Sequence, residues 1–162
     1  QIVQAMGFST LATGFVVAIP FVASMFAMIL WGRSSDKANE RIWHVALPAA
    51  VAVAGLLVAS LESSNLVVFL ALCIVLVCLL ALQGPFWALP STFLGGTAAA
   101  GGIALVNTIG TGGGGFAGPY VLGVLREATG GYSAGMAVLA IGPALTATIV
   151  LALSRRMAIR PA

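Results

Sequence analysis

Residues 66–89 read LVVFLALCIVLVCLLALQGPFWAL, a run in which no side chain carries a charge. A membrane-spanning helix needs about 20 mainly apolar residues to cross roughly 30 Å of hydrocarbon, so this run is long enough for one crossing. The whole chain has the same character, since 60% of its 162 residues are hydrophobic and 7% are charged. An ordinary soluble domain has about a quarter of its residues charged, so the composition predicts a membrane protein.

The charged residues divide the chain into separate spans. They fall into four short clusters, at 33–41, 62, 126–127 and 155–160. The uncharged stretch 63–125 would make a single helix of about 95 Å, far longer than a bilayer, so the chain must turn back within it. Turn-forming residues at 90–97, PSTFLGGT, mark that reversal. The sequence therefore predicts an all-α membrane protein with five transmembrane helices, at about 8–31, 43–61, 66–89, 98–125 and 132–153.

The basic residues predict the orientation of the chain, because lysine and arginine gather on the cytoplasmic side of a membrane. With five alternating spans, Arg126 lies on one side and the other six basic residues lie opposite. Those six are Arg33, Lys37, Arg41, Arg155, Arg156 and Arg160. We therefore expect a multi-pass protein of the inner (cell) membrane, with the N-terminus outside and the C-terminus in the cytoplasm.

The first residues suggest a longer parent protein. Residues 1–7, QIVQAMG, do not start with methionine and lack the basic region and cleavage site of an export signal. A chain that starts outside the membrane without such a signal is expected to continue upstream. Residues 1–162 are thus expected to be the partial C-terminal transmembrane domain of a longer polytopic protein.

The loop WGRSSDKANERIWH, residues 31–44, mixes charges of both signs more densely than any other stretch. Gly32 allows close helix approach, and Asp36 can pair with Lys37 or Arg41. Such a cluster can hold two helices in one conformation and release them in another. The alternative is a solvated turn with basic flanks. Asn39 suits either reading, because asparagine tolerates left-handed backbone angles.

The loop resembles the motif Gly-x-x-x-Asp-(Arg/Lys)-x-Gly-x-(Arg/Lys) of the major facilitator superfamily, in the copy between its eighth and ninth helices. Gly32, Asp36, Lys37 and Arg41 match this motif, and Asn39 stands where the family often has glycine. Residues 84–136, from GPFWALPSTFL through AAAGGIALVNTIG to GGYSAGM, are similar to helices ten to twelve of the anion:cation symporter branch. The resemblance implies helices eight to twelve of a C-terminal half, with helices one to seven missing.

That resemblance also implies a function. Members of this branch are secondary active transporters that carry small organic acids, such as tartrate and sugar acids, together with protons by alternating access. The expected partners are therefore the lipid bilayer, the missing N-terminal half, a small organic acid and protons. A Trp of helix ten and an Asn of helix eleven contact the acid in the branch, and Trp87 and Asn107 match these positions.

The polar side chains within the predicted spans give the same candidates a physical basis, because polar groups inside a bilayer are costly. Gln83 and Trp87 lie four residues apart on one helical face, and the next span contains Asn107 with Thr108 and Thr111. We predict that Trp87, Asn107 and Gln83 bind substrate, with the indole N–H of Trp87 donating one hydrogen bond to it. The alternatives are an interfacial position for Trp87 and an interhelical hydrogen bond for Asn107.

The glycine run NTIGTGGGGFAGPY, residues 107–120, contains the spacing Gly-x-Gly-x-x-Gly of dinucleotide-binding loops. Such a loop follows a strand and precedes an acidic residue about 20 positions on, and this sequence has neither. Gly110, Gly114 and Gly118 instead fall at every fourth position, which favours close helix packing in a membrane. Each glycine weakens a helix by up to about 1 kcal/mol, and Pro119 removes one backbone hydrogen bond, so we also predict bending.

The remaining composition narrows the function classes. One histidine, the lack of an acidic residue within a predicted span and the lack of a paired nucleophile and base give no support to an enzyme, and we expect no cofactor, no metal and no nucleic-acid partner. The alternative to a transporter fragment is a five-helix membrane scaffold that oligomerises through its glycine helix. A pore would need a polar stripe along a whole helix, which no predicted span has.

Overall fold

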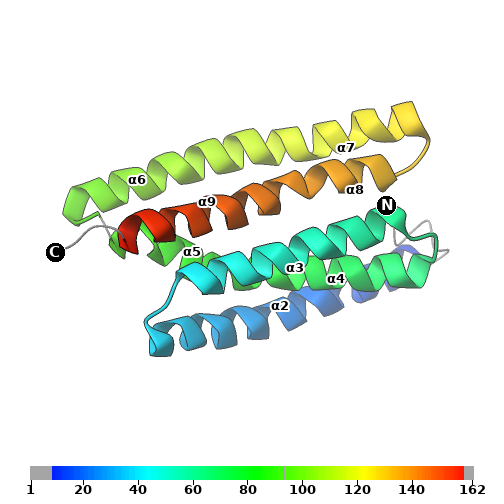
Figure 1. The fold of residues 1–162 in the computed structure, drawn as a ribbon. Coiled ribbons are helices and arrows are strands. Elements are labelled where there is room, and N and C mark those ends of the chain that lie inside the picture. Colours follow the sequence, from blue (N-terminus) through cyan, green and yellow to red (C-terminus); the bar gives the residue numbers. More distant parts are fainter. Residues whose placement is uncertain (1–8, 93, 159–162) are drawn as a thin grey trace.

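The computed structural model describes residues 9–92 and 94–158, which form an all-helical bundle (Figure 1). The predicted all-α class is confirmed for these residues. The helices are α2 (Thr10–Ala38), α3 (Ile42–Leu61), α4 (Asn65–Ala81), α5 (Gln83–Ala88), η1 (Pro90–Thr92), α6 (Gly96–Ile109), η2 (Gly110–Gly114), α7 (Gly115–Thr129), α8 (Ser133–Leu139) and α9 (Ile141–Ala158).

Four helical segments among the described residues are long and apolar enough to cross a membrane. They are Thr10–Ala38, Ile42–Leu61, Asn65–Thr92 and Ser133–Arg155. They correspond to four of the five predicted spans, although Phe8, the predicted start of the first span, lies outside the described residues. The remaining predicted span, 98–125, falls within the glycine-rich rod formed by α6, η2 and α7, which is helical but is not among these four.

The first helix is longer than predicted. The expected end was residue 31, but α2 continues through the charged residues to Ala38. The hydropathy pattern locates the apolar part of a helix, whereas Arg33 and Lys37 can continue the same helix beyond it, because both residue types favour helices. Asn39 then ends α2 with φ 47° and ψ 40°, the left-handed conformation that asparagine tolerates.

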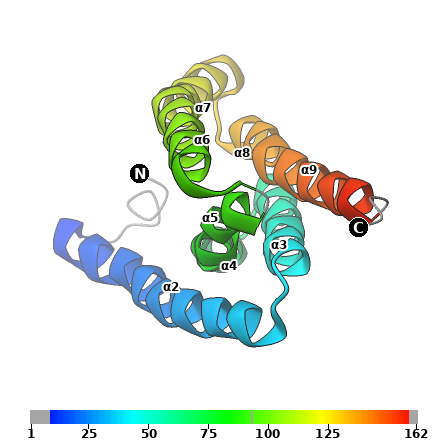
Figure 2. The same ribbon diagram turned by 90° about the vertical axis from the view of Figure 1, so that its left-hand side faces the viewer.

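Small residues on α3 build the centre of the bundle. Helix α3 packs against both α4 and α9, and α2 packs on the other side of α4 (Figure 2). The buried face of α3 lets α4 approach closely at Gly55, where an added Cβ would lie 2.7 Å from Cγ2 of Val75 and 3.3 Å from the carbonyl oxygen of Ala71. The buried small residues of this face are Ala46, Ala49, Ala52 and Ala59.

The outer faces of the bundle are apolar. Leu11, Phe15 and Ile19 on α2 are 75%, 70% and 65% exposed. Phe116 on α7 is 71% exposed. Contiguous apolar surface of this kind is covered by lipid or by further protein in a folded membrane protein.

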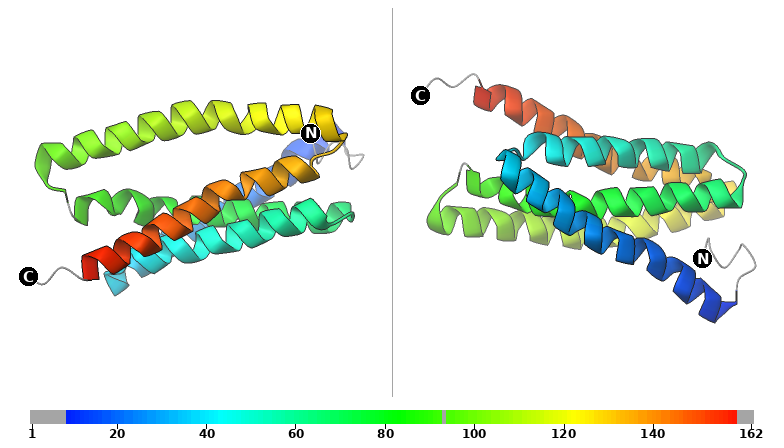
Figure 3. Two further views of the ribbon diagram at one scale, coloured as in Figure 1. Left: turned by 45° about the horizontal axis from the view of Figure 1, so that its top comes forward. Right: turned by 90° about the horizontal axis from the view of Figure 1, so that it is seen from below.

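The glycine run departs from α-helical winding. Residues Gly110–Gly114 form a π-helical turn between α6 and α7, and the resulting rod is bowed rather than straight (Figure 3). Apart from chain neighbours and the backbone of the same helix, no described atom lies within 4 Å of where a Cβ would stand on Gly110, Gly114 or Gly118. Within the described residues, the predicted packing face of these three glycines is therefore open, and its role in helix packing stays a prediction.

Two basic segments, the corner at residues 33–41 and the end of α9, lie at the same end of the bundle. Figure 1 shows the turn between α2 and α3 close to the end of α9, whereas the turn after α7, which follows Arg126, is at the opposite end. This arrangement agrees with the predicted grouping of Arg33, Lys37, Arg41 and Arg155. Arg160 lies outside the described residues.

Candidate substrate site

The three residues predicted to bind substrate line one cavity. Gln83 and Trp87 come from α5, and Asn107 comes from α6. The cavity has a volume of about 390 Å³. Its other described lining residues are Leu82, Phe86, Val106, Gly110, Thr111 and Thr146.

The local fold explains why these side chains meet. Leu82 separates α4 from α5, and the buried Pro85 fills the first turn of α5, where proline is tolerated because its missing N–H has no helical partner. The chain then reverses through η1 and Gly95, so that α6 returns beside α5. Asn107 and Thr111 lie one turn apart, where α6 passes into the π-helical turn. The predicted turn at 90–97 therefore brings the polar side chains of α5 and α6 together, although they are far apart in the sequence.

Both amide side chains have their carbonyl oxygens engaged. The indole N–H of Trp87 donates to Oε1 of Gln83 at 2.9 Å, and the hydroxyl of Thr111 donates to Oδ1 of Asn107 at 3.2 Å. Each bond joins residues four apart on one helix. The Trp87 N–H, which we expected to donate to a substrate, is therefore already used within α5 in this conformation.

Sequence reasoning missed Thr146. This residue comes from α9, the last helix, and lines the cavity beside the α5 and α6 residues. Its hydroxyl donates to the carbonyl oxygen of Gly142 at 3.1 Å, so the hydroxyl oxygen can still accept a bond. Thr146 and Thr148 are the polar residues in the otherwise apolar stretch 141–153, a signal that could have pointed to it.

The loop motif forms only part of the cluster that the sequence predicted. Nη1 of Arg41 lies 2.6 Å from Oδ1 of Asp36 and also donates to the buried Ser35 hydroxyl at 2.8 Å. Lys37 lies in the last turn of α2, and the space beside Gly32 is open within the described residues. The structure therefore joins Asp36 to Arg41, whereas Gly32 has no close helix neighbour among the described residues.

A second set of contacts at this corner was not predicted. Glu40 caps the start of α3 by accepting from the backbone N–H groups of Trp43 at 2.7 Å and His44 at 3.2 Å, and its Oε2 lies 2.7 Å from Nδ1 of His44. Burial raises the pKa of Glu40, but these hydrogen bonds outweigh it and leave the pKa below its ordinary value. The turn is therefore held by an acidic cap as well as by an ion pair.

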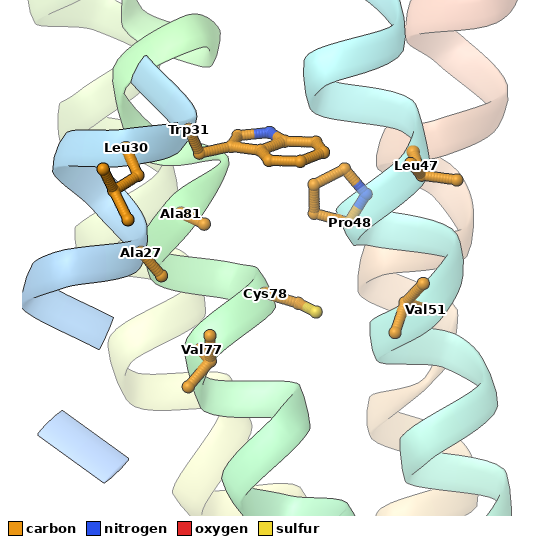
Figure 4. Close-up of a pocket in the computed structure, with 9 residues that line it drawn as sticks. All are labelled: Ala27, Leu30, Trp31, Leu47, Pro48, Val51, Val77, Cys78 and Ala81. Carbon is orange, nitrogen blue, oxygen red and sulfur yellow. The ribbon is translucent and has the colours of Figure 1, made fainter. Parts of the chain in front are cut away.

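A second cavity, also of about 390 Å³, lies between α2, α3 and α4 near this corner. Figure 4 shows the Trp31 ring reaching from α2 toward Pro48 on α3, with Cys78 on α4 deeper in the cavity. Its other described lining residues are Ala27, Leu30, Leu47, Val51, Val77 and Ala81. This lining is apolar, so the cavity offers little to orient an organic acid.

The apolar helices, with a polar cavity between them, place the chain in the class of polytopic α-helical membrane proteins.

No family model and no solved structure matches the chain. Several curated relatives do match it, including three that are named as transporters or transport proteins. A protein of Agrobacterium vitis named "Putative tartrate transporter" is 39% identical over 155 residues, 96% of this chain and 36% of its own length. The "Quinolone resistance transporter" of Acinetobacter baumannii is 35% identical over 83% of this chain and 31% of its own length.

The third relative is the "Putative metabolite transport protein NicT" of Pseudomonas putida, which is 33% identical over 91% of this chain and 34% of its own length. These homologues confirm the predicted recognition, because proteins named as transporters match most of the chain, as expected for a C-terminal fragment of the major facilitator type. It spans about a third of the length of the curated relatives that it matches.

Proposed function

We propose that this chain forms part of the C-terminal half of a secondary active transporter that moves a small organic anion together with protons. The observation that supports the proposal is the cavity lined by Gln83 and Trp87 of α5 and by Asn107 of α6. A site between helices, with a few polar groups in an apolar wall, is the usual form of a small-molecule site. The name "Putative tartrate transporter" of one relative supports the proposed substrate class, and tartrate is the first acid to test.

In this proposal the chain supplies an uncharged wall of the substrate site. The described lining residues contain amides, hydroxyls and rings but no ionised group, so the cation that balances an organic anion belongs to the remaining half of the protein. The open face at Gly110, Gly114 and Gly118 is where that half, or a neighbouring helix, can approach closely.

Alternating access then requires that the helices move relative to one another around the site. The Asp36–Arg41 pair at the corner between α2 and α3 is proposed to hold one conformation and to release it during the cycle. We propose that this corner and the end of α9 face the cytoplasm of a bacterial-type inner membrane, because both are basic.

Replacing Asn107 by alanine in the full-length protein tests the site. The KM for tartrate uptake is expected to rise about tenfold, the loss of one hydrogen bond to a charged ligand, with normal protein levels in the membrane. Thr148→Ala is the matched control, since Thr148 is exposed on α9 and is not among the residues that line the cavity. Unchanged uptake kinetics in the Asn107 variant would remove this residue from the site. The alternative of a non-transporting scaffold predicts no uptake even in the unmodified protein.

A further inference from the structure

The two amides of the cavity are held in one orientation by residues of their own helices. An indole N–H can only donate, so its partner in the Trp87–Gln83 bond must be the amide oxygen, and the Gln83 NH₂ group is left unengaged by this contact. On the neighbouring helical segment, the hydroxyl of Thr111 donates to the amide oxygen of Asn107. Each contact engages one of the two lone pairs of an amide oxygen and leaves the NH₂ group of that amide unengaged by the contact.

We infer that Trp87 and Thr111 are positioning residues, which fix the Gln83 and Asn107 amides so that their NH₂ groups serve the bound anion. The inference rests on the proposed function. A carboxylate has only acceptors, and each amide NH₂ offers two donors, so the fixed orientation matches a carboxylate without any charge on this wall. A freely turning amide would present its oxygen to the carboxylate part of the time and weaken binding.

This role differs from the one that the sequence predicted for Trp87. There the indole N–H was expected to donate to the substrate itself. In the structure it contacts Gln83, and the Trp87 ring packs edge-on against Phe86 with centroids 5.0 Å apart. Trp87 therefore acts on polar recognition through Gln83, and the two residues should behave as one unit.

A double-mutant cycle in the full-length protein tests that unit. Trp87→Phe keeps most of the ring and removes the N–H, and Gln83→Leu removes the amide. Each single variant is expected to raise the KM for tartrate uptake about tenfold with little change in maximal rate. The double variant should be no worse than Gln83→Leu, because both substitutions remove the same interaction. Effects that multiply would show that Trp87 acts without Gln83 and would overturn the inference.

The second arm uses Thr111. Thr111→Val removes the hydroxyl at similar volume and should raise the KM, whereas Thr111→Ser keeps the hydroxyl and should restore the unmodified value. An equal KM in the Val and Ser variants would overturn the role of Thr111.

A selectivity measurement separates positioning from a general structural effect. The monoamide of tartrate, which replaces one carboxylate by a carboxamide, is used as a competitor. The fixed donors of the unmodified site should favour tartrate over this competitor, and Trp87→Phe should reduce the preference at least severalfold, because the released Gln83 amide can then turn and accept. An unchanged preference would overturn the inference. If Trp87→Phe changes neither KM nor preference while Asn107→Ala still raises the KM, the proposed function stands and this inference alone fails.

Discussion

The indole nitrogen of Trp31 lies 2.8 Å from the carbonyl oxygen of His44, so the end of α2 is tied to the first turn of α3. The two rings also contact each other, with centroids 5.0 Å apart. Tryptophan and histidine near the end of a membrane span are often simple interfacial residues. The structure instead joins them across the corner, above the apolar cavity that Trp31 helps to line.

Trp31→Phe should therefore destabilise the protein by about 1 kcal/mol, the usual net contribution of one hydrogen bond. The measurement is thermal unfolding of the full-length protein in detergent. Trp43→Phe provides the control, because the Trp43 residue is 63% exposed at the same corner. Equal losses in the two variants would contradict a specific role for the Trp31–His44 bond.

Asp36→Asn should slow transport at least severalfold and leave tartrate binding unchanged. The Asp36 side chain is 69% exposed, so its ion pair with Arg41 contributes little to stability, and its proposed effect is on the conformational cycle. Uptake rate and equilibrium binding, measured on the same preparation, separate the two effects. Glu62→Gln is the control, since Glu62 follows the other end of α3. A normal uptake rate would favour a simple solvated turn.

Gly55→Ala should destabilise the bundle by about 1–3 kcal/mol, the usual cost of overpacking a close contact. The new methyl group would meet the Val75 side chain and the backbone oxygen of Ala71. Gly14→Ala is the matched control, because this glycine lies within α2 and no described atom beyond its chain neighbours and the backbone of its own helix lies within 4 Å of where its Cβ would stand. The two melting temperatures give the comparison, and a stable Gly55 variant would show that α3 and α4 can separate without cost.

Glu40→Gln should reduce stability at pH 5.5 and have progressively less effect at lower pH. The folded-state pKa of Glu40 is lowered by its hydrogen bonds, so the stabilisation is present above the ordinary pKa of 4.5 and is lost as the pH falls through the lower folded value. Melting temperatures of both forms between pH 5.5 and 3 measure this. A difference that does not change with pH would contradict the ionised cap.

Four of the five predicted spans have matching apolar helices among the described residues, and they could be predicted because the hydropathy pattern shows which residues the bilayer accepts. The same pattern could not show that α2 continues to Ala38, since a charged helix outside the bilayer carries no hydropathy signal. For the site, the four-residue spacing of Gln83 and Trp87 was sufficient to place them together, but whether they bind each other or a ligand depends on side-chain rotamers. Thr146 could not be assigned because its place in the cavity depends on how α9 packs.

Close helix contacts also occur at glycines that the sequence did not single out. The packing role of the run at 110–118 stays a prediction, whereas the described helices approach closely at Gly55 and at Gly135, which packs on Leu122. Each of these glycines is a single small residue facing a larger side chain on a neighbouring helix. Such a contact has no distinctive sequence signal, because it depends on the partner as much as on the glycine.

The π-helical turn at Gly110–Gly114 gives the rod a second possible length. If this turn rewinds as α-helix, the segment before it rotates by about 100° and shifts by about 1.5 Å relative to the segment after it. Asn107 would then rotate away from Gln83, which belongs to α5 and would not move with it. Four of the five residues in this turn are glycines and offer little steric resistance to such rewinding. Rewinding would therefore separate the two sides of the polar wall while the helices before and after the turn stay folded.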